Sequence, residues 1–192
     1  MKPSLVLFSG LPGTGKSYLS NRLARELSWP LLRIDDIAAC FPVEVDRAAT
    51  GFWDQTILIL LQLAGAQLAL GVSVILDSIF MNLDRIHAQS IAQASGARFL
   101  PVHTLVSDEA AWEQRVKQRH TVSNPANGVA SWEQIQIQRR FYRAWQPGTA
   151  LFVDTARSPE ENYAAVLAFV TGPEDHLVPL PELEFTPGKY HN

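Results

Sequence analysis

The chain has one cysteine, Cys40, among its 192 residues. A single thiol excludes an internal disulfide framework and any zinc site built from several cysteines. The five histidines are scattered along the sequence without the paired spacing of a metal site. A chain so poor in thiols suits a reducing compartment, and we expect a cytoplasmic protein.

Long apolar runs are also missing. The run Leu5–Phe8 is followed closely by Gly10 and Pro12, so it is too short for the core of a signal peptide. The most apolar stretch, Ile57–Leu70, is too short to span a bilayer and contains Gln62. We expect a buried helix there and no membrane-spanning segment.

Charge is sparse and slightly acidic. Charged residues make up 18% of the chain, and 16 basic against 19 acidic side chains give a net charge of −3. This balance excludes a polybasic protein that binds membranes or nucleic acid through its overall charge. With 47% hydrophobic residues, the chain is globular. We expect one domain over residues 1–171 and a Pro-rich tail over residues 172–192.

Strand and helix patterns alternate along the chain. Five short apolar runs predict strands at residues 5–8, 31–34, 72–76, 99–106 and 151–153. Amphipathic or apolar segments between them predict helices, among them Trp53–Leu70 and Asn82–Ala94. Buried strands joined by helices indicate an α/β fold: a five-stranded parallel sheet with helices on both faces.

Two capping boxes mark helix starts in the C-terminal third. They begin at Ser131 and Ser158, and we expect the first of these helices to continue to about Trp145. Between this helix and the one before it, residues 120–130 contain Asn, Pro and Gly. These residues are expected to form a mobile lid.

Residues 10–17 read GLPGTGKS and match the P-loop pattern G-x-x-x-x-G-K-[ST]. Glycines let the backbone wrap around a phosphate, and the start of the following helix attracts the same anion. Lys16 adds a charge at the β- and γ-phosphates, and the Ser17 hydroxyl is a ligand for Mg²⁺. The sequence predicts an ATP and Mg²⁺ site that includes Gly10, Pro12, Gly13, Thr14, Gly15, Lys16, Ser17 and Tyr18.

Carboxylates follow two of the expected strands, at the edge where parallel sheets bind ligands. Asp77 comes directly after a buried strand, as a Walker-B acid near the metal does. Asp35 and Asp36 are expected to end the second strand. They either orient and deprotonate a hydroxyl, or one caps a helix beside a solvated neighbour. We interpret Asp84 and Arg85 as surface residues, with Arg85 able to face the ligand crevice.

Arginines flank the expected lid on both sides. Arg115 and Arg119 lie four residues apart on one helix, and Arg139, Arg140 and Arg143 follow on the next. They form either a solvated basic face or a clamp that closes on phosphate. In an acidic chain with a P-loop, the concentration of five arginines favours the clamp.

The chain resembles the small P-loop kinases that include 5′-polynucleotide kinase domains, chloramphenicol phosphotransferase and AAA-type ATP-binding proteins. The matching pieces are GLPGTGKS, RIDD, VSVILDS with Asp84-Arg85 after it, and RVKQR before the lid. They occur in the family's order and cover about residues 5–157.

The resemblance implies a three-layer fold of the nucleoside-kinase type with a lid, and transfer of phosphate from Mg-ATP to a hydroxyl of a small molecule. Asp35 matches the aspartate that accepts the hydroxyl proton. Arg119 matches the lid arginine that stabilises the transferring phosphoryl group, with Arg115 nearer the adenine. The stretch 154–157, which ends at Arg157, matches the loop next to the adenine.

Two other functions stay open, a 5′-hydroxyl polynucleotide kinase and a regulatory ATP-binding module without kinase activity. Polynucleotide kinases carry an arginine shortly after the aspartate pair, where this chain has Ile37-Ala38-Ala39. Together with the acidic balance, this disfavours a nucleic-acid partner, because affinity for nucleic acid depends on neutralising phosphates. The sequence determines neither the acceptor nor the oligomeric state.

Overall fold

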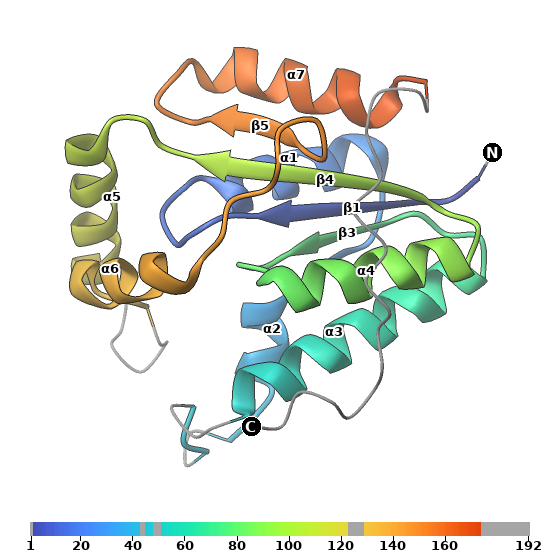
Figure 1. Ribbon diagram of the computed structural model, residues 1–192, viewed down its shortest axis with the longest axis horizontal. Helices are drawn as coiled ribbons and strands as arrows, with labels where there is room; N and C mark the ends of the chain where they lie inside the picture. The colour runs from blue at the N-terminus through green and yellow to red at the C-terminus, as the bar shows by residue number, and fades with distance from the viewer. Residues whose placement is uncertain (1, 43–44, 48–50, 123–128, 174–192) are drawn as a thin grey trace.

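The computed structural model describes residues 2–42, 45–47, 51–122 and 129–173. Its five strands form one parallel sheet in the order β2-β3-β1-β4-β5 (Figure 1). The strands are β1 (Ser4–Ser9), β2 (Leu31–Arg33), β3 (Val74–Asp77), β4 (Arg98–Leu105) and β5 (Leu151–Asp154). The α/β fold expected from the alternating pattern is confirmed.

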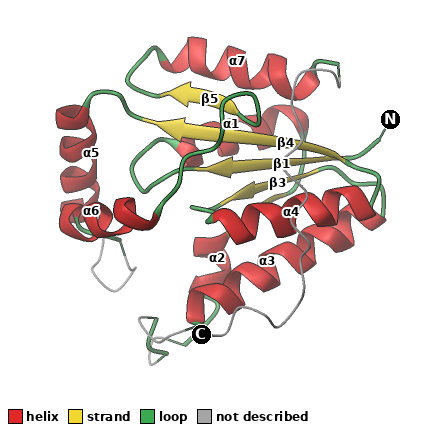
Figure 2. Ribbon diagram, in the orientation of Figure 1, coloured by secondary structure: helices red, strands yellow, loops and turns green. Residues whose placement is uncertain are grey.

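Helices cover both faces of the sheet (Figure 2). The helices are α1 (Lys16–Leu27), α2 (Ile34–Ala39), α3 (Phe52–Ala69), α4 (Asn82–Ala94), α5 (Glu109–Val122), α6 (Trp132–Phe141) and α7 (Pro159–Thr171). Helices α3 and α4 pack on one face, and α1 and α7 pack on the other. Helices α5 and α6 lie beyond the carboxyl ends of the strands (Figure 1).

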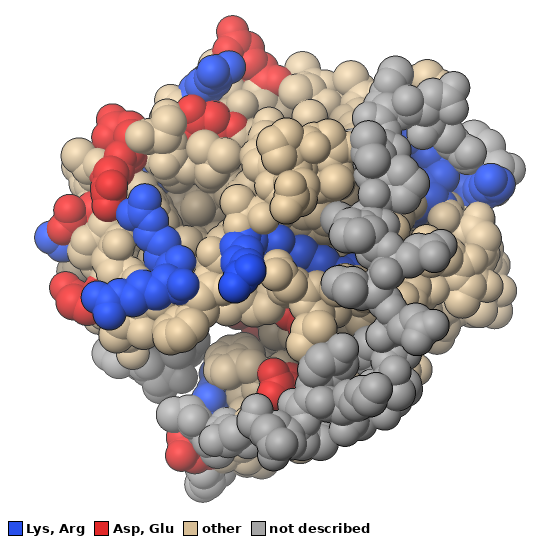
Figure 3. All heavy atoms as spheres, viewed as in Figure 1, with Lys and Arg blue, Asp and Glu red and all other residues tan. Residues whose placement is uncertain are grey.

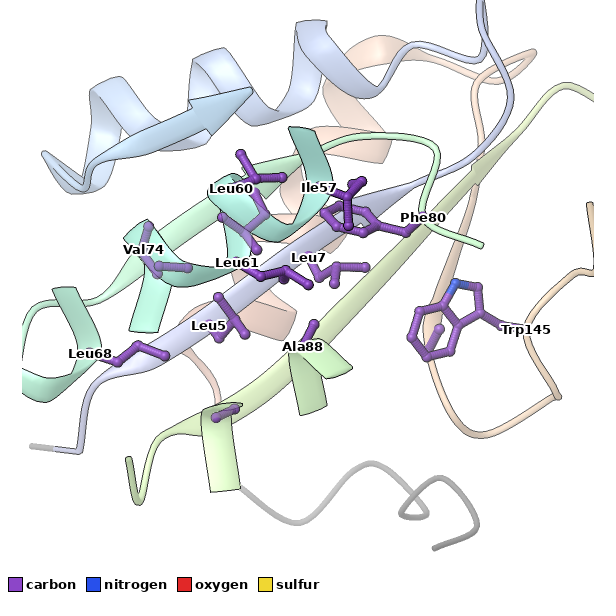
Figure 4. Close-up of a cluster of buried hydrophobic side chains, with 14 residues drawn as sticks. Leu5, Leu7, Ile57, Leu60, Leu61, Leu68, Val74, Phe80, Ala88 and Trp145 are labelled. Carbon is purple, nitrogen blue, oxygen red and sulfur yellow. The ribbon is translucent and has the colours of Figure 1, made fainter. Parts of the chain in front are cut away.

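The two faces of β1 build two separate hydrophobic clusters. Leu5 and Leu7 pack into the cluster that faces α3 and α4 (Figure 4), whereas Val6 and Phe8 pack toward α1 and α7. Successive side chains of a strand point to opposite faces, so a central strand covered on both sides has no solvent-facing position. This requirement explains the uninterrupted apolar run before the P-loop.

The register of the sheet brings the strand ends together. Phe8 of β1 pairs with Asp77 of β3, and Ser9 pairs with His103 of β4. Because β1 leads directly into the P-loop, Asp77 and His103 lie on either side of its first residues. The carboxyl edge of the sheet therefore carries the P-loop and the polar residues that follow the central strands.

Two expectations about the elements were wrong in detail. Asp35 and Asp36 do not end a strand, because β2 stops at Arg33 and both carboxylates lie in the first turn of α2. Acidic side chains are favoured there by the helix dipole. Helix α6 ends at Phe141 rather than near Trp145, since Tyr142 adopts an extended backbone.

Helix α3 is only partly the buried helix that its composition predicts. Leu60, Leu61 and Ala64 are fully buried, whereas Leu58 and Leu63 remain exposed. No helix in the described part of the chain is long and apolar enough to cross a membrane.

The capping boxes predicted the helix starts correctly. Ser131 and Gln134 form a reciprocal box at α6, and the Ser158 hydroxyl accepts a hydrogen bond from Glu161 N at α7. Helix α5 continues into the expected lid as far as Val122, while residues 123–128 lie outside the described residues. Residues 174–192 of the expected tail also lie outside them, and the division at residue 171 stays a prediction.

Candidate functional site

The P-loop joins β1 to α1, and its glycines are required by both conformation and space. Gly10 and Gly13 have positive φ angles of 144° and 80°. A Cβ atom on Gly10 would lie 2.4 Å from the Thr104 carbonyl oxygen, and one on Gly13 would lie 2.7 Å from a methyl group of Val116. A side chain at either position would force the loop away from β4 or α5.

The start of α1 supplies the remaining P-loop residues. Gly15 is the N-cap residue, with a φ of 87°, and no side chain caps the helix there. The first turn of α1 contains no acidic residue, so its free N–H groups and positive dipole end are available to an anion. Ser17 and Tyr18 follow on this turn and are exposed.

Lys16 is buried, with 8% of its surface exposed. Its ammonium donates hydrogen bonds to the carbonyl oxygens of Gly10 and Leu11, at 2.7 Å and 3.0 Å from Nζ. The Lys16 side chain therefore folds back toward the first residues of the P-loop.

Charges from three other elements act on Lys16. Burial lowers the pKa of its ammonium, while the carboxylates of Asp77 and then Asp35 raise that pKa and the Arg119 guanidinium lowers it. These residues come from β3, α2 and α5. The residues that the sequence singled out for metal, acceptor and lid therefore all act electrostatically on the P-loop lysine.

Asp77 is held in place by α1. The Ser20 hydroxyl donates a 3.0 Å hydrogen bond to Asp77 Oδ2, and both residues are buried. Sequence reasoning missed Ser20, although it lies one turn after Ser17, a spacing that places both on neighbouring parts of one helix surface.

One hydroxyl and one carboxylate fit the protein's share of a Mg²⁺ site. Magnesium commonly keeps several waters and takes one or two carboxylates together with phosphate oxygens. Ser17 and Asp77 supply oxygen donors of these kinds. In the described part of the chain no group of three or more His, Cys, Asp or Glu could hold a metal ion.

The two aspartates of α2 have different surroundings. Arg33 donates two hydrogen bonds to the Asp36 carboxylate, from Nε at 2.8 Å and from Nη2 at 2.6 Å. Neither aspartate is the helix cap that we gave as the alternative, because the N-cap residue of α2 is Arg33 and no side chain forms a cap hydrogen bond there. Asp35 is exposed, and no described side chain forms a hydrogen bond or ion pair with it.

The loop after β5 lies against the P-loop. Arg115 donates to Thr155 Oγ1 at 3.0 Å and to the Thr155 carbonyl at 2.9 Å. The same hydroxyl donates to the Thr14 carbonyl at 3.1 Å. Arg157 is exposed, with Nε 4.0 Å from Asp154 Oδ2. Arg115 and Arg157 thus flank a loop that touches the P-loop, and Thr155, within the stretch 154–157 that the resemblance singled out, makes the contact.

Helices α5 and α6 are fastened to the P-loop through Trp112. Its indole N–H donates to the Pro12 carbonyl at 2.9 Å, and its ring packs edge-on against Trp132. Arg139 lies over the Trp112 ring and pairs with Glu109 at 2.9 Å. Figure 3 shows acidic side chains close to the basic ones over these helices. Arg139 is therefore neutralised locally, while Arg119 is exposed.

Asp84 and Arg85 are not the surface residues that we expected. Arg85 is 3% exposed, and its Nε donates to the Phe80 carbonyl at 2.8 Å. Asp84 is half-buried and accepts a 2.7 Å hydrogen bond from Met81 N. Burial raises the pKa of Asp84 to about 6. Arg85 turns inward toward the segment after α6, where its Nη1 donates to the Arg143 carbonyl at 2.8 Å.

A family model for the AAA domain matches residues 5–144, most of the chain. No protein of curated function matches the sequence. Among solved structures, a candidate kinase from Chloroflexus aurantiacus is 27% identical, with a TM-score of 0.68 over 86% of this chain and 93% of that one.

Two further structures share the fold at lower identity. A sugar kinase from Janibacter is 18% identical, with a TM-score of 0.66 over 88% of this chain and 94% of that one. The APS kinase of Mycobacterium tuberculosis, in complex with AMPPNP and APS, is 18% identical, with a TM-score of 0.62 over 89% and 99%. These matches confirm the resemblance to small P-loop kinases, and the chain belongs to the AAA domain family.

Proposed function

We propose that this protein is a kinase that transfers the γ-phosphoryl group of Mg-ATP to a hydroxyl group of a small molecule. The observation that carries the proposal is the electrostatic convergence of Asp77, Asp35 and Arg119 on Lys16. A nucleotide-binding site alone needs the P-loop and a metal ligand. Phosphoryl transfer uses two further groups, a carboxylate without an ion-pair partner and an arginine near the lid. Asp35 and Arg119 are groups of these kinds.

Each group has one task in this mechanism. The P-loop amides and Lys16 bind the β- and γ-phosphates, and Mg²⁺ between Ser17 and Asp77 would offset the charge of the phosphates. Asp35 orients the acceptor hydroxyl and takes its proton as the bond to phosphorus forms. Arg119 stabilises the charge on the transferring group.

The acceptor that fits this site is a small hydroxyl compound without a phosphate. Arg33 is the arginine next to the α2 carboxylates, and its guanidinium is engaged by both oxygens of Asp36. The positions after Asp36 are Ile37, Ala38 and Ala39 and offer no cation. The sugar kinase and APS kinase neighbours support a small-molecule acceptor in general.

A screen for ATP consumption tests the proposal. Purified protein is incubated with Mg-ATP and a panel of sugars, hydroxylated antibiotics, other hydroxylated metabolites and 5′-hydroxyl oligonucleotides, with Lys16→Ala as the inactive control. Consumption that depends on a small molecule and on Lys16 supports the kinase. Consumption with oligonucleotides alone identifies a polynucleotide kinase. Tight binding of Mg-ATP without turnover in any arm indicates a regulatory module and contradicts the proposal.

A further inference from the structure

Arg85 is a buried cation without a carboxylate partner among the described residues. Nε donates to the Phe80 carbonyl and Nη1 to the Arg143 carbonyl, both at 2.8 Å. Nη2 is buried and has no hydrogen-bond partner. Burial lowers the pKa of this guanidinium. Keeping an unpaired charge inside a protein is costly, so the contacts that Arg85 makes require an explanation.

One contact fixes the loop between β3 and α4. Phe80 has a positive φ of 51°, which is unfavourable for a bulky side chain, and its carbonyl accepts the hydrogen bond from Arg85 Nε. The carbonyl of the preceding residue, Ile79, accepts a hydrogen bond from Gly10 N at 3.4 Å. Arg85 therefore holds a strained turn that supports the first residue of the P-loop.

The other contacts fix the segment that returns from α6. The Arg85 guanidinium lies over the rings of Tyr142 and Trp145, at 4.9 Å and 4.8 Å from their centroids. Trp145 Nε1 donates to Ser9 Oγ at 2.7 Å, and Ser9 directly precedes the P-loop. Figure 4 shows Phe80 and Trp145 near the Leu7 end of the core cluster.

We propose that Arg85 is a positioning residue that anchors the C-terminal hinge of the α5–α6 hairpin to the P-loop. The hairpin carries Arg119, and its two ends join the body of the domain at the start of α5 and at residues 142–145. Arg85 binds the second of these joints and the β3–α4 loop at once. The catalytic part of this inference rests on the proposed function, because it assumes that Arg119 acts on the transferring phosphate.

The geometry requires a guanidinium rather than a positive charge alone. Two carbonyls from separate segments accept N–H groups from two different nitrogens of one planar guanidinium, and that guanidinium lies over the rings of Tyr142 and Trp145. The lysine ammonium is a point charge on a flexible stem, and it cannot match this arrangement. Arg85→Lys therefore keeps the positive charge but loses the hydrogen-bonding geometry of the anchor, whereas Arg85→Met loses both.

The test compares Arg85→Lys, Arg85→Met and the exposed control Arg25→Met, after thermal melting has shown which variants are folded. Hydrogen exchange followed by mass spectrometry should show faster exchange at residues 78–84 and 142–150 in both Arg85 variants. Turnover of the acceptor found by the screen should fall by about 10²-fold, the cost of a small misplacement, while affinity for Mg-ATP changes little. Arg25→Met should match the wild type in every measurement.

Several results would overturn the inference. Wild-type exchange and turnover in a folded Arg85→Met variant would show that the anchor is dispensable. Full activity in Arg85→Lys would assign the role to charge. If Arg85→Met does not fold, Arg85→Lys decides, because it keeps the charge but cannot reach the Phe80 and Arg143 carbonyls together. Wild-type exchange at residues 78–84 and 142–150 in Arg85→Lys would then contradict the anchor. The exchange arm needs no acceptor, so it tests the anchor even if the kinase proposal fails.

Discussion

Ser20 holds Asp77 through a 3.0 Å hydrogen bond between two buried side chains. Helix α1 therefore does more than present its N-terminus to phosphate. It offers the Ser17 hydroxyl at its exposed first turn and, one turn later, fixes one oxygen of the carboxylate that lies near Lys16. The carboxylate that we propose as a Mg²⁺ ligand is thus held by the helix that begins at the P-loop.

Ser20→Ala should weaken the magnesium dependence of nucleotide binding and lower the stability of the fold. A buried acceptor that loses its donor costs about 1–3 kcal/mol, so the free energy of unfolding should fall by that amount. Urea unfolding and titration of ATP at several Mg²⁺ concentrations measure the two effects. Ser17→Ala is the matched control, because its exposed hydroxyl should contribute to magnesium binding and hardly to stability. Equal stability of Ser20→Ala and the wild type would refute the claim.

Lys16→Ala should lower the affinity for Mg-ATP by roughly 2–3 kcal/mol, the scale of a charge-assisted contact. The substitution removes the one buried cation of the P-loop and leaves the glycines unchanged. Isothermal titration calorimetry measures the affinity. Lys117→Ala is the control, since Lys117 pairs with Glu113 on the outer face of α5 and should not affect binding. Unchanged affinity in folded Lys16→Ala protein would exclude the P-loop as the nucleotide site.

Asp35→Asn should reduce kcat by roughly 10²–10⁴, the usual contribution of a positioned base, without weakening ATP binding. Asp36→Asn should be much milder, because Asp36 is engaged with Arg33 on the surface and exposed ion pairs contribute little. Steady-state kinetics with the acceptor from the screen measure both variants. A larger loss at Asp36 would reverse the assignment, and no loss at either position would count against the kinase proposal.

Arg119→Ala should lower kcat by about 10³-fold or more and change ATP affinity little, as expected for an arginine that acts on charge in the transition state. Arg115→Ala should lower ATP affinity more than kcat. It loses two hydrogen bonds to Thr155 in the loop beside the P-loop, so nucleotide affinity should suffer more than turnover. Kinetics and calorimetry on both variants separate the roles. If Arg119→Ala keeps wild-type kcat, Arg119 is a solvated surface residue.

The sequence predicted the parts of the site that depend on local chemistry. The P-loop is contiguous, so its glycines, Lys16 and the neighbouring strand and helix are visible together in eight residues and their flanks. Asp77 could be found because a buried strand leads directly to it. The five-stranded parallel sheet followed from the alternation of short apolar runs with helices.

The parts that sequence reasoning missed depend on contacts between distant segments. Arg85 was expected at the surface because arginine is rarely buried, and no local pattern shows that the Phe80 and Arg143 carbonyls meet its side chain. Thr155 links Arg115 to Thr14 across more than a hundred residues. Such contacts are set by how α4, α5 and the strand ends pack, which hydrophobic periodicity does not encode.

Asp84 should make the fold less stable as pH rises, which is the reverse of the usual effect of a carboxylate on stability. Burial, with a smaller contribution from the charge of Asp54, raises its pKa from 3.8 to about 6, against the opposing hydrogen bond from Met81 N. Between these two values the native state holds a proton that the unfolded state has released. The stability that Asp84 contributes is therefore fully present below about pH 4 and is lost as pH rises through 6.

Asp84→Asn should reveal this loss, because the amide is neutral at every pH and its oxygen can still accept from Met81 N. Relative to the wild type, the free energy of unfolding of the variant should rise by about 2 kcal/mol between pH 4 and pH 7.5, from a shift of about two pKa units. His103 titrates in the opposite sense, since burial lowers its pKa to about 4. It is present in both proteins, so its contribution cancels in the difference. Urea unfolding at the two pH values provides the measurement. A stability difference that is the same at pH 4 and pH 7.5 would show that the Asp84 carboxylate is solvated and titrates normally.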